Sequence, residues 1–326
     1  MAFKVFIDGE SGTTGLQIRD RLRNRADLAQ ISIDPAHRKD PDARADALNR
    51  ADAVILCLPD EAAKEAISLI TQDNVRVIDT STAHRVARDW TYGFAEMERG
   101  QRNAIAKSAR VANPGCFAIG AIALLRPIIK AGLLPPEFPV AINALSGYTG
   151  GGKALIAEFE RTTPPTGTRD AFRIYGLSLA HKHVPEIQTY SELAHPPVFV
   201  PSVGRYAQGM ILEIPLQLWA FPSTTTSTNL RDTLADAYKG SQFVDVASEE
   251  ESVRLQTVRM NANGYVAALD PESLNGTNRM RIFVFSNKEQ QQVRLITVLD
   301  NLGKGAAGAA VQNLNLMLGL EESVGL

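Results

Sequence analysis

Cys116 has the setting of a catalytic nucleophile. It follows the turn Asn113-Pro114-Gly115 and begins an apolar segment, 117–125, that is long enough for a buried helix. At a helix N-terminus, unpaired backbone N–H groups and the positive end of the helix dipole stabilise an anion, which favours the reactive thiolate. The alternative is that Cys116 is a small buried hydrophobic residue, as free cysteines usually are.

His181 and His183 are the candidate acid–base groups. They precede Pro185 and Glu186, which together are typical of a helix start. In an extended segment both imidazoles point to the same side, and one imidazole near a thiolate is sufficient for proton transfer. The sequence leaves open which ring faces the sulfur, and two polar residues on a solvated strand are the alternative interpretation. A metal site needs a third ligand of similar clustering, and none is evident beside this pair, so we expect no metal.

A glycine-rich stretch near the N-terminus predicts a dinucleotide site. A strand over 4–8 leads into this stretch, and residues 16–22 have apolar side chains at helical spacing. Glycines in this context let the backbone approach a pyrophosphate, which rests on the N-terminus of the helix. The spacing is G-x-x-G-x-x-G rather than G-x-G-x-x-G, so a turn without a ligand is the alternative. The candidate cofactor-binding residues of this stretch are Gly9, Ser11, Gly12, Thr13, Thr14 and Gly15.

The end of the second strand bears on which cofactor is bound. The strand over 29–33 ends at Asp34, which is where an acidic residue would hold the ribose 2′-hydroxyl of NAD. Arg38 and Lys39 follow closely, and a guanidinium at this place suits the 2′-phosphate of NADP. We therefore expect NADP, with Arg38 and Lys39 as cofactor-binding residues. NAD held by Asp34 is the alternative.

The alternation of strands and helices continues and predicts an open parallel α/β sheet. Buried strands are expected over 53–58, 75–79 and 109–112, with a helix over 61–70. Strand carboxyl ends face the ligand crevice of such a sheet, so Pro59 and Ser81 are candidate cofactor-binding residues. Just beyond the same strand end, Arg85 is a candidate for a substrate phosphate or carboxylate. Cys57 lies among aliphatic residues and is expected to be structural.

After the Cys116 helix the regular alternation of predicted strands and helices ends. Longer strands are expected over 140–145, 210–216, 281–285 and 292–298, which indicates a mostly antiparallel sheet and an α+β second domain. Residues 146–153 are too glycine-rich for a stable element and are expected to form a mobile loop over a substrate or a tight connection.

The C-terminal stretch predicts a helix that returns to the first domain. Residues 306–320 combine small side chains with aliphatic ones, which suits a helix pressed against other backbone or a cofactor. That return would bring Asn301 and Gly303 near the nicotinamide. We therefore expect a dinucleotide-binding Rossmann domain over 1–115 plus 301–326. The α+β domain, over 116–300, would be catalytic.

Composition excludes several classes of partner. The chain has 326 residues, a formal net charge of −2, a pI near 6.2 and no basic block, so we expect no nucleic-acid surface. No apolar run of about 18 residues is present, so we expect no membrane span. Cys57 and Cys116 are the only cysteines of the sequence and make no disulfide framework, which favours a cytoplasmic setting.

Taken in order, these motifs resemble the N-acetyl-γ-glutamyl-phosphate reductase family, especially its shorter type. The residues that carry the resemblance are Asn113-Pro-Gly-Cys116-Phe, His181-Lys-His183-Val-Pro-Glu-Ile and Asp300-Asn-Leu-Gly-Lys-Gly305, with Gly9 to Gly15, Ile78 to Arg85 and Tyr92 to Glu96. The match spans residues 5 to 320. The family's longer type has Ser-Gly-x-Ser-Gly-Ala-Gly where this chain has Ser146-Gly-Tyr-Thr-Gly-Gly-Gly152.

The resemblance implies an activity and an assembly. It implies NADPH-dependent reduction of a small acyl phosphate to a semialdehyde through a thioester on Cys116, with phosphate as the other product. Asn113, Arg85, Ser146 and Tyr148 are the implied substrate residues, and Asn301 is an implied cofactor residue. The implied architecture is that of aspartate-semialdehyde dehydrogenase, in which the second domain also builds a homo-oligomer, a dimer or tetramer.

Three other functions stay open at this point. An aspartate-semialdehyde-dehydrogenase-like reductase would use the same thiolate and cofactor. A cysteine acyl hydrolase would have no use for the glycine stretch, and a redox-inactive nucleotide-binding regulator would have no use for Cys116.

Overall fold

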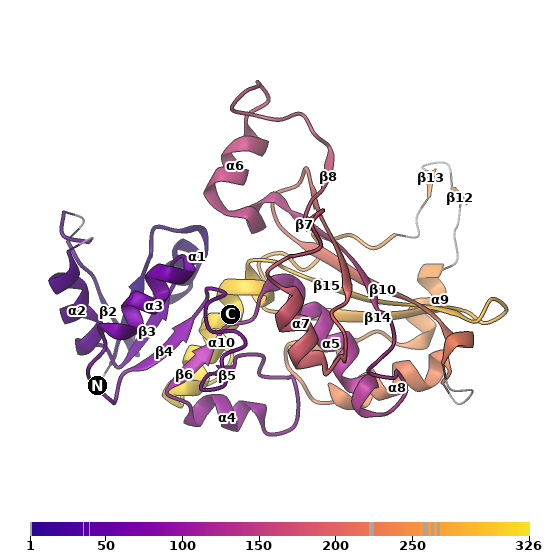
Figure 1. The fold of residues 1–326 in the computed structure, drawn as a ribbon, viewed down its shortest axis with the longest axis horizontal. Helices are drawn as coiled ribbons and strands as arrows, with labels where there is room; N and C mark the ends of the chain where they lie inside the picture. The colour runs from indigo at the N-terminus through magenta and orange to yellow at the C-terminus, as the bar shows by residue number, and fades with distance from the viewer. Residues whose placement is uncertain are drawn as a thin grey trace. The chain divides into compact units, whose positions relative to one another are not determined.

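The computed structural model describes residues 2–34, 36–38, 40–221, 225–256, 260–261, 264–265 and 268–326. These residues form two compact units (Figure 1): one holds the chain up to Gly115 together with Gly305–Leu326, and the other is Cys116–Lys304. Residues 301–304, which the sequence analysis assigned to the first domain, fall in the second unit. In the described parts of the chain, no helix combines the length and apolar composition needed to cross a bilayer.

The first unit contains a parallel sheet with the strand order β2-β1-β3-β4-β6-β5. Its strands are β1 (Phe3–Asp8), β2 (Leu28–Ile31), β3 (Ala53–Leu56), β4 (Arg76–Asp79), β5 (Thr91–Tyr92) and β6 (Arg110–Ala112). Its helices are α1 (Thr13–Leu22), α2 (Pro41–Arg50), α3 (Asp60–Ser68), α4 (Gln101–Lys107) and α10 (Gly308–Leu318). The chain moves outward from β1 to β2 and then returns to β3, so the order reverses beside β1, which is where such sheets bind ligands. The predicted doubly wound sheet is confirmed.

Both faces of this sheet are covered by apolar contacts. Val5 and Ile7 of β1 join a buried cluster with α1 and α10, while Phe6 joins a second cluster with α2 and α3. Burial on both faces explains why the strands read as continuous apolar runs. The C-terminal helix is part of this core, since Ala310 and Leu314 of α10 are fully buried in the first cluster.

The second unit contains a mixed sheet with the strand order β11-β14-β15-β10-β7-β9-β8. Its strands are β7 (Ala141–Gly147), β8 (Phe172–Ile174), β9 (Val198–Gly204), β10 (Met210–Gln217), β11 (Val244–Val246), β14 (Met280–Asn287) and β15 (Gln292–Leu299). The four strands predicted from the sequence, β7, β10, β14 and β15, pair antiparallel with one another. The pairs β7–β9 and β11–β14 are parallel, which makes the sheet mixed. A short hairpin, β12 (Met260–Asn261) and β13 (Gly264–Tyr265), stands apart from it.

Helix α5 (Cys116–Lys130) is the central helix of the second unit. It contacts β10 and β15 of the sheet and the helices α7 (Val184–Ser191) and α8 (Ser227–Ala237). A Cβ atom on Gly120 would lie 2.7 Å from Thr297 Oγ1 of β15, so the glycine lets the helix approach the sheet closely. Both α8 and α9 (Glu249–Gln256) contact β14, and α8 also contacts β11.

The glycine-rich stretch 146–153 differs from the expectation of a segment without stable structure. It forms the end of β7, a 3₁₀ turn over Tyr148–Gly151 and the start of α6 (Gly152–Glu160). The amides of Tyr148 and Thr149 donate to the carbonyls of Tyr206 and Ala207. These backbone hydrogen bonds stabilise the turn, and side-chain propensity alone did not reveal them.

Candidate active site

Cys116 is the first residue of α5, as predicted. The helix that follows is apolar and almost entirely buried, which fixes its N-terminus in the unit. The ring of the next residue, Phe117, contacts three rings edge-on: those of His181, His183 and Phe199, at centroid distances of 6.2, 5.8 and 5.4 Å. Both acid–base candidates therefore pack against the residue that directly follows the nucleophile candidate.

The histidine segment is a turn, not the extended strand considered from the sequence. His183 has helical backbone angles and immediately precedes α7, and Pro185 is in the first turn of that helix as predicted. The two imidazoles lie edge to face with centroids 4.8 Å apart. The turn is closed by the side chain of His181, because its Nδ1 accepts a hydrogen bond of 3.2 Å from the backbone N–H of His183.

Because of that hydrogen bond, the two imidazole rings differ in which nitrogen can take part in proton transfer. Since Nδ1 of His181 accepts a hydrogen bond from a backbone N–H, the neutral form of this ring carries its own proton on Nε2. His183 is 4% exposed, so its imidazole is held inside the unit. In the described part of the chain, His, Cys, Asp and Glu side chains form no group of three or more that could hold a metal ion.

Sequence reasoning missed Tyr175, which lies beside the His181 ring, and did not foresee that Glu186 in the first turn of α7 is buried. The Tyr175 ring lies 5.8 Å from that of His181, and its pKa is raised above the ordinary value by burial and by the negative charge of Cys116. Its hydroxyl is therefore a protonated donor near the sulfur. Glu186 is 1% exposed in the first turn of α7, and its charge, together with burial, raises the pKa of Tyr190 to about 12. The available signal was their position within eight residues of His183.

The other cysteine is chemically different. Burial raises the pKa of Cys57 to about 12, and the charges of Asp79 and Asp8 add to the shift. Neither cysteine is in a disulfide. At neutral pH Cys57 is therefore a neutral thiol, which agrees with the structural role expected from its aliphatic neighbours.

The glycine stretch forms a tight cradle between β1 and α1. Gly9 has φ of +88°, and a Cβ atom on it would lie 2.3 Å from the carbonyl oxygen of Cys57. A Cβ on Gly15 would lie 2.5 Å from the carbonyl oxygen of Gly9. Gly12 is the N-cap of α1 and, having no side chain, makes no capping hydrogen bond to the first turn of the helix, which begins at Thr13 and Thr14. Ser11 is exposed on the same loop. This arrangement fits a pyrophosphate.

The predicted cofactor rim lies at the carboxyl ends of β2, β3 and β4. Arg38 is exposed in the turn after β2, and Lys39 lies outside the described residues. The Asp34 carboxylate accepts the Ala36 amide at 2.8 Å, so it shapes this turn. Pro59 precedes the first residue of α3, and Ser81 is 8% exposed.

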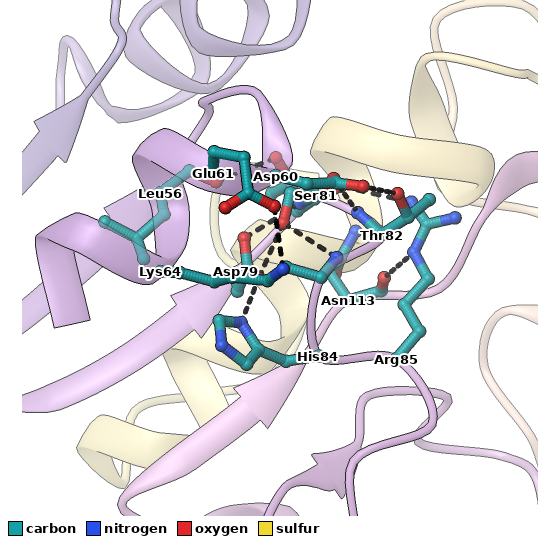
Figure 2. Close-up of polar contacts among 12 residues, drawn as sticks. Leu56, Asp60, Glu61, Lys64, Asp79, Ser81, Thr82, His84, Arg85 and Asn113 are labelled. Atoms are coloured by element: carbon teal, nitrogen blue, oxygen red, sulfur yellow. Dashed lines mark hydrogen bonds and ion pairs between the residues drawn. The ribbon is translucent and has the colours of Figure 1, made fainter.

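Arg85 and Asn113 meet at the ends of β4 and β6 (Figure 2). Arg85 Nε donates to the Asn113 carbonyl and Nη2 to the Thr80 carbonyl, both at 3.1 Å. The Asn113 side chain donates to the Ala306 carbonyl at 3.0 Å and accepts from Asn313 at 3.0 Å. Asn113 was predicted to contact substrate, but these bonds commit its side chain to the C-terminal segment. Sequence reasoning missed Asn313, which lies 200 residues away.

The remaining predicted residues lie around the 3₁₀ turn after β7. Ser146 is 5% exposed and donates to the Gly147 carbonyl, and the Tyr148 ring stacks on Phe159 at 5.5 Å. Asn301 accepts the Gly209 amide at 2.7 Å and donates to Thr149 Oγ1 at 3.0 Å. The side chain of Asn301 therefore links this turn to the residue before β10, and its contact with a cofactor stays a prediction.

Two family models match the chain. The semialdehyde dehydrogenase NAD binding domain matches residues 15–107, and the semialdehyde dehydrogenase dimerisation domain matches residues 116–301. Among solved structures, aspartate semialdehyde dehydrogenase II from Vibrio cholerae aligns with a TM-score of 0.66 at 14% identity, over 98% of this chain and 99% of that one. Aspartate semialdehyde dehydrogenase from Candida albicans aligns with a TM-score of 0.62 at 12% identity, over 98% and 99%. At such identities the likeness establishes the fold.

Sequence relatives are much closer. Proteins named N-acetyl-gamma-glutamyl-phosphate reductase from Brucella anthropi and Brucella suis are each 53% identical over 317 residues, which are 97% of this chain. The aligned regions cover 98% and 99% of those two proteins. The chain belongs to the N-acetyl-gamma-glutamyl-phosphate reductase family, within the semialdehyde dehydrogenase fold.

Proposed function

We propose that this protein is an NADPH-dependent oxidoreductase that reduces N-acetyl-γ-glutamyl phosphate to N-acetyl-L-glutamate 5-semialdehyde and inorganic phosphate, a step of arginine biosynthesis. The observation that carries the proposal is the cluster of Cys116, Tyr175, His181 and His183 at the N-terminus of α5. Family membership supplies the substrate, because the relatives at 53% identity carry that name.

The first chemical step belongs to Cys116. Its thiolate attacks the carbonyl carbon of the acyl phosphate, and a C–S bond forms. The C–O bond to the phosphate then breaks, and phosphate leaves with that electron pair. The product is a thioester on Cys116, and the backbone N–H groups at the start of α5 stabilise the oxyanion that develops on the way.

The second step reduces the thioester. NADPH, when bound, supplies the hydride for the carbonyl carbon. An imidazole donates a proton to the carbonyl oxygen during reduction and accepts it again as the C–S bond breaks, which releases the semialdehyde and the sulfur. We assign this role to His183, because Nδ1 of His181 is occupied by the His183 amide, and we assign the Tyr175 hydroxyl to the same oxygen as a second donor.

The glycine cradle and its rim support NADP as the cofactor. The uncapped N-terminus of α1 suits the pyrophosphate, and the loop after β2 carries the exposed guanidinium of Arg38 for a 2′-phosphate. We assign Lys39, Pro59 and Ser81 to the same rim. For the substrate phosphate we propose Arg85, which stands at the carboxyl end of β4 and is bonded to Asn113, three residues before Cys116 in the sequence.

We further propose that the protein works as a homo-oligomer in the cytoplasm. Phe172, Ile174 and Val198 are each about half exposed, at 52%, 50% and 51%, and the register of β8 and β9 places them on one face of the sheet. Apolar side chains gathered in this way mark an interaction surface. The two free cysteines agree with a reducing compartment.

The test of the proposed activity is NADPH formation in the reverse direction. Purified protein is mixed with NADP, inorganic phosphate and N-acetylglutamate semialdehyde, and the absorbance of NADPH is followed; a parallel sample contains aspartate semialdehyde. Signal only with the acetylated substrate and only with phosphate present is expected. A signal with aspartate semialdehyde would assign the protein to the sister activity, and no signal in either sample would overturn the proposal.

A further inference from the structure

The loop that follows β4 is fastened to both neighbouring strand ends. Thr80 donates from its amide and its hydroxyl to the Leu56 carbonyl at the end of β3, at 3.0 and 2.8 Å. Thr82 donates from its amide to the Asp60 carboxylate at 2.9 Å, beside the start of α3. On the other side, Arg85 donates to the Asn113 carbonyl after β6. The loop is therefore a braced platform at the edge of the sheet where ligands bind.

The brace inside the platform is the carboxylate of Asp79. It is completely buried and accepts three hydrogen bonds: from the Ser81 amide at 2.9 Å, the Ser81 hydroxyl at 2.7 Å and His84 Nδ1 at 2.6 Å. An ionised carboxylate only accepts, so Nδ1 of His84 carries the proton in this bond. The hydrogen bond to Asp79 is made at the edge of the imidazole, and one face of the ring stacks on Trp90, with centroids 4.2 Å apart and planes 14° apart.

Nothing in the proposed chemistry uses His84, although the ring is held on two sides. Its side chain is 14% exposed. Figure 2 shows the imidazole directed toward Asp79 while the guanidinium of the next residue, Arg85, extends in another direction. Locking His84 therefore fixes the backbone from which Arg85 projects, and the two carbonyl contacts of Arg85 fix its side chain.

We propose that Asp79 and His84 are positioning residues that hold Arg85 in the geometry needed to bind the phosphoryl group of the substrate. The inference rests on the proposed function, since it takes Arg85 as the phosphate ligand. A guanidinium recognises phosphate through donors in a fixed planar fork, so small changes in its orientation weaken binding strongly. A loop that is already ordered before the anion arrives avoids the entropy cost of ordering during binding.

The experiment measures the KM for inorganic phosphate in the NADPH-forming direction. His84→Ala is expected to raise this KM about tenfold, because the hydrogen bond to Asp79 that orders the backbone before Arg85 is lost. The KM values for NADP and the aldehyde should stay within about twofold, because Ser81 keeps its own two hydrogen bonds to Asp79. Arg85→Ala is expected to raise it further. In the double variant His84→Ala with Arg85→Ala, the His84 change should add nothing, because it acts through Arg85.

Two conservative variants separate positioning from general stability. The amide of His84→Asn places an N–H close to the position of Nδ1 and is expected to restore most of the phosphate affinity. The amide of His84→Gln projects farther and is expected to behave like His84→Ala. His195→Ala, at an exposed histidine of the second unit, serves as the matched control and should equal the parent protein. The Tm of each variant is measured alongside.

A second readout keeps this inference distinct from the reaction itself. The rise of Tm with inorganic phosphate, at constant ionic strength, reports anion binding without turnover. A parent protein that binds phosphate yet forms no NADPH would refute the proposed function and leave the positioning claim supported if His84→Ala weakens that binding. An unchanged phosphate KM and thermal response in His84→Ala, or additive effects with Arg85→Ala, would overturn the inference.

Discussion

The two cysteines differ in reactivity because their surroundings differ. Burial raises the pKa of Cys57 to about 12, so at pH 8 this thiol is protonated and unreactive. Both cysteines are partly exposed, and what sets Cys116 apart is its position at a helix N-terminus. We predict that iodoacetamide at pH 8 labels Cys116 and leaves Cys57 unmodified until the protein is unfolded, as read by peptide mass spectrometry. Labelling of both cysteines at similar rates in the native protein would be inconsistent with this assignment.

The raised pKa of Cys57 also makes the stability of the folded protein depend on pH. Because the folded pKa of Cys57 lies above its ordinary value of 9.0, the folded state holds the proton more tightly than the unfolded state. The stability that comes from burying the neutral thiol is fully present below pH 9 and is lost as the pH rises toward 12. Cys57 should accordingly become reactive only in strongly alkaline buffer.

The histidine pair shows what the residue pattern left undetermined. The sequence indicated two imidazoles near a helix start, and α7 begins where Pro185 predicted. The extended conformation considered for this segment does not occur, because the backbone turns at His183 and its amide donates a hydrogen bond to His181 Nδ1. A side chain that hydrogen-bonds to a nearby backbone amide can turn the chain away from regular structure, and the pattern of apolar residues does not reveal such a bond.

Alanine substitutions at Gly9 and Gly12 of the glycine cradle should have contrasting effects. Gly9→Ala places a Cβ 2.3 Å from the Cys57 carbonyl and forces a left-handed backbone on alanine, so we predict a fall in Tm of several degrees. Gly12→Ala meets only an ordinary contact of 3.4 Å, so it should fold normally yet bind NADPH more weakly, because the methyl group covers the helix N-terminus. Thermal melts with and without NADPH make the comparison.

The outcomes are distinct for these two glycines. An unchanged NADPH-induced rise in Tm for Gly12→Ala would show that the cradle does not hold the pyrophosphate. A Gly9→Ala protein as stable as the parent would contradict the packing of this loop against β3.

We assign the choice between NADP and NAD to Arg38 and Lys39, which follow β2 in the sequence. We predict that Arg38→Ala combined with Lys39→Ala raises the KM for NADPH far more than that for NADH, since a charge-assisted bond to the 2′-phosphate contributes about 1.5–3 kcal/mol. Steady-state kinetics with both cofactors measures the difference. Equal effects on the two KM values would instead favour NAD and a ribose contact from Asp34.

Some elements were predictable from sequence, and some were not. The strands of the first unit have apolar residues on both faces, so β1, β3 and β4 stood out as continuous runs. Their ends were less certain: β2 ends at Ile31 and β3 at Leu56, each two residues before the predicted end. The turn over Tyr148–Gly151 was missed because its hydrogen-bond partners lie about 58 residues later, in the loop 206–207.

At the scale of the whole molecule, the second unit has an apolar sheet face that we assign to self-association. Ile174→Glu with Val198→Glu places two charges on this face, and we predict dissociation to a smaller species in light scattering after gel filtration. Val324→Glu, at a half-exposed apolar side chain of the first unit, is the matched control. A parent protein that is already monomeric, or an unchanged mass in the double variant, would refute the oligomer proposal.

The architecture of two units followed from the sequence, while the contacts that unite each unit did not. Asn113 illustrates the difference: its position before Cys116 was evident, but its bonds to Ala306 and Asn313 join residues 193 and 200 positions away. Asp79 and His84 likewise lie in a recognisable motif, yet their hydrogen bond and the stacking on Trp90 depend on the folded path of the loop. The sequence motifs therefore predicted which residues are chemically important, whereas their partners depend on contacts between distant parts of the chain.

The most direct test of the account is to trap the acyl-enzyme. The protein is mixed with N-acetyl-γ-glutamyl phosphate in the absence of NADPH, and phosphate release and protein mass are followed together. We predict a burst of phosphate equal to the enzyme concentration and an N-acetylglutamyl adduct on the Cys116 peptide, and both should be absent from Cys116→Ser. Continuous phosphate release without NADPH would identify a hydrolase, and a burst or an adduct that survives Cys116→Ser would contradict the thioester on Cys116.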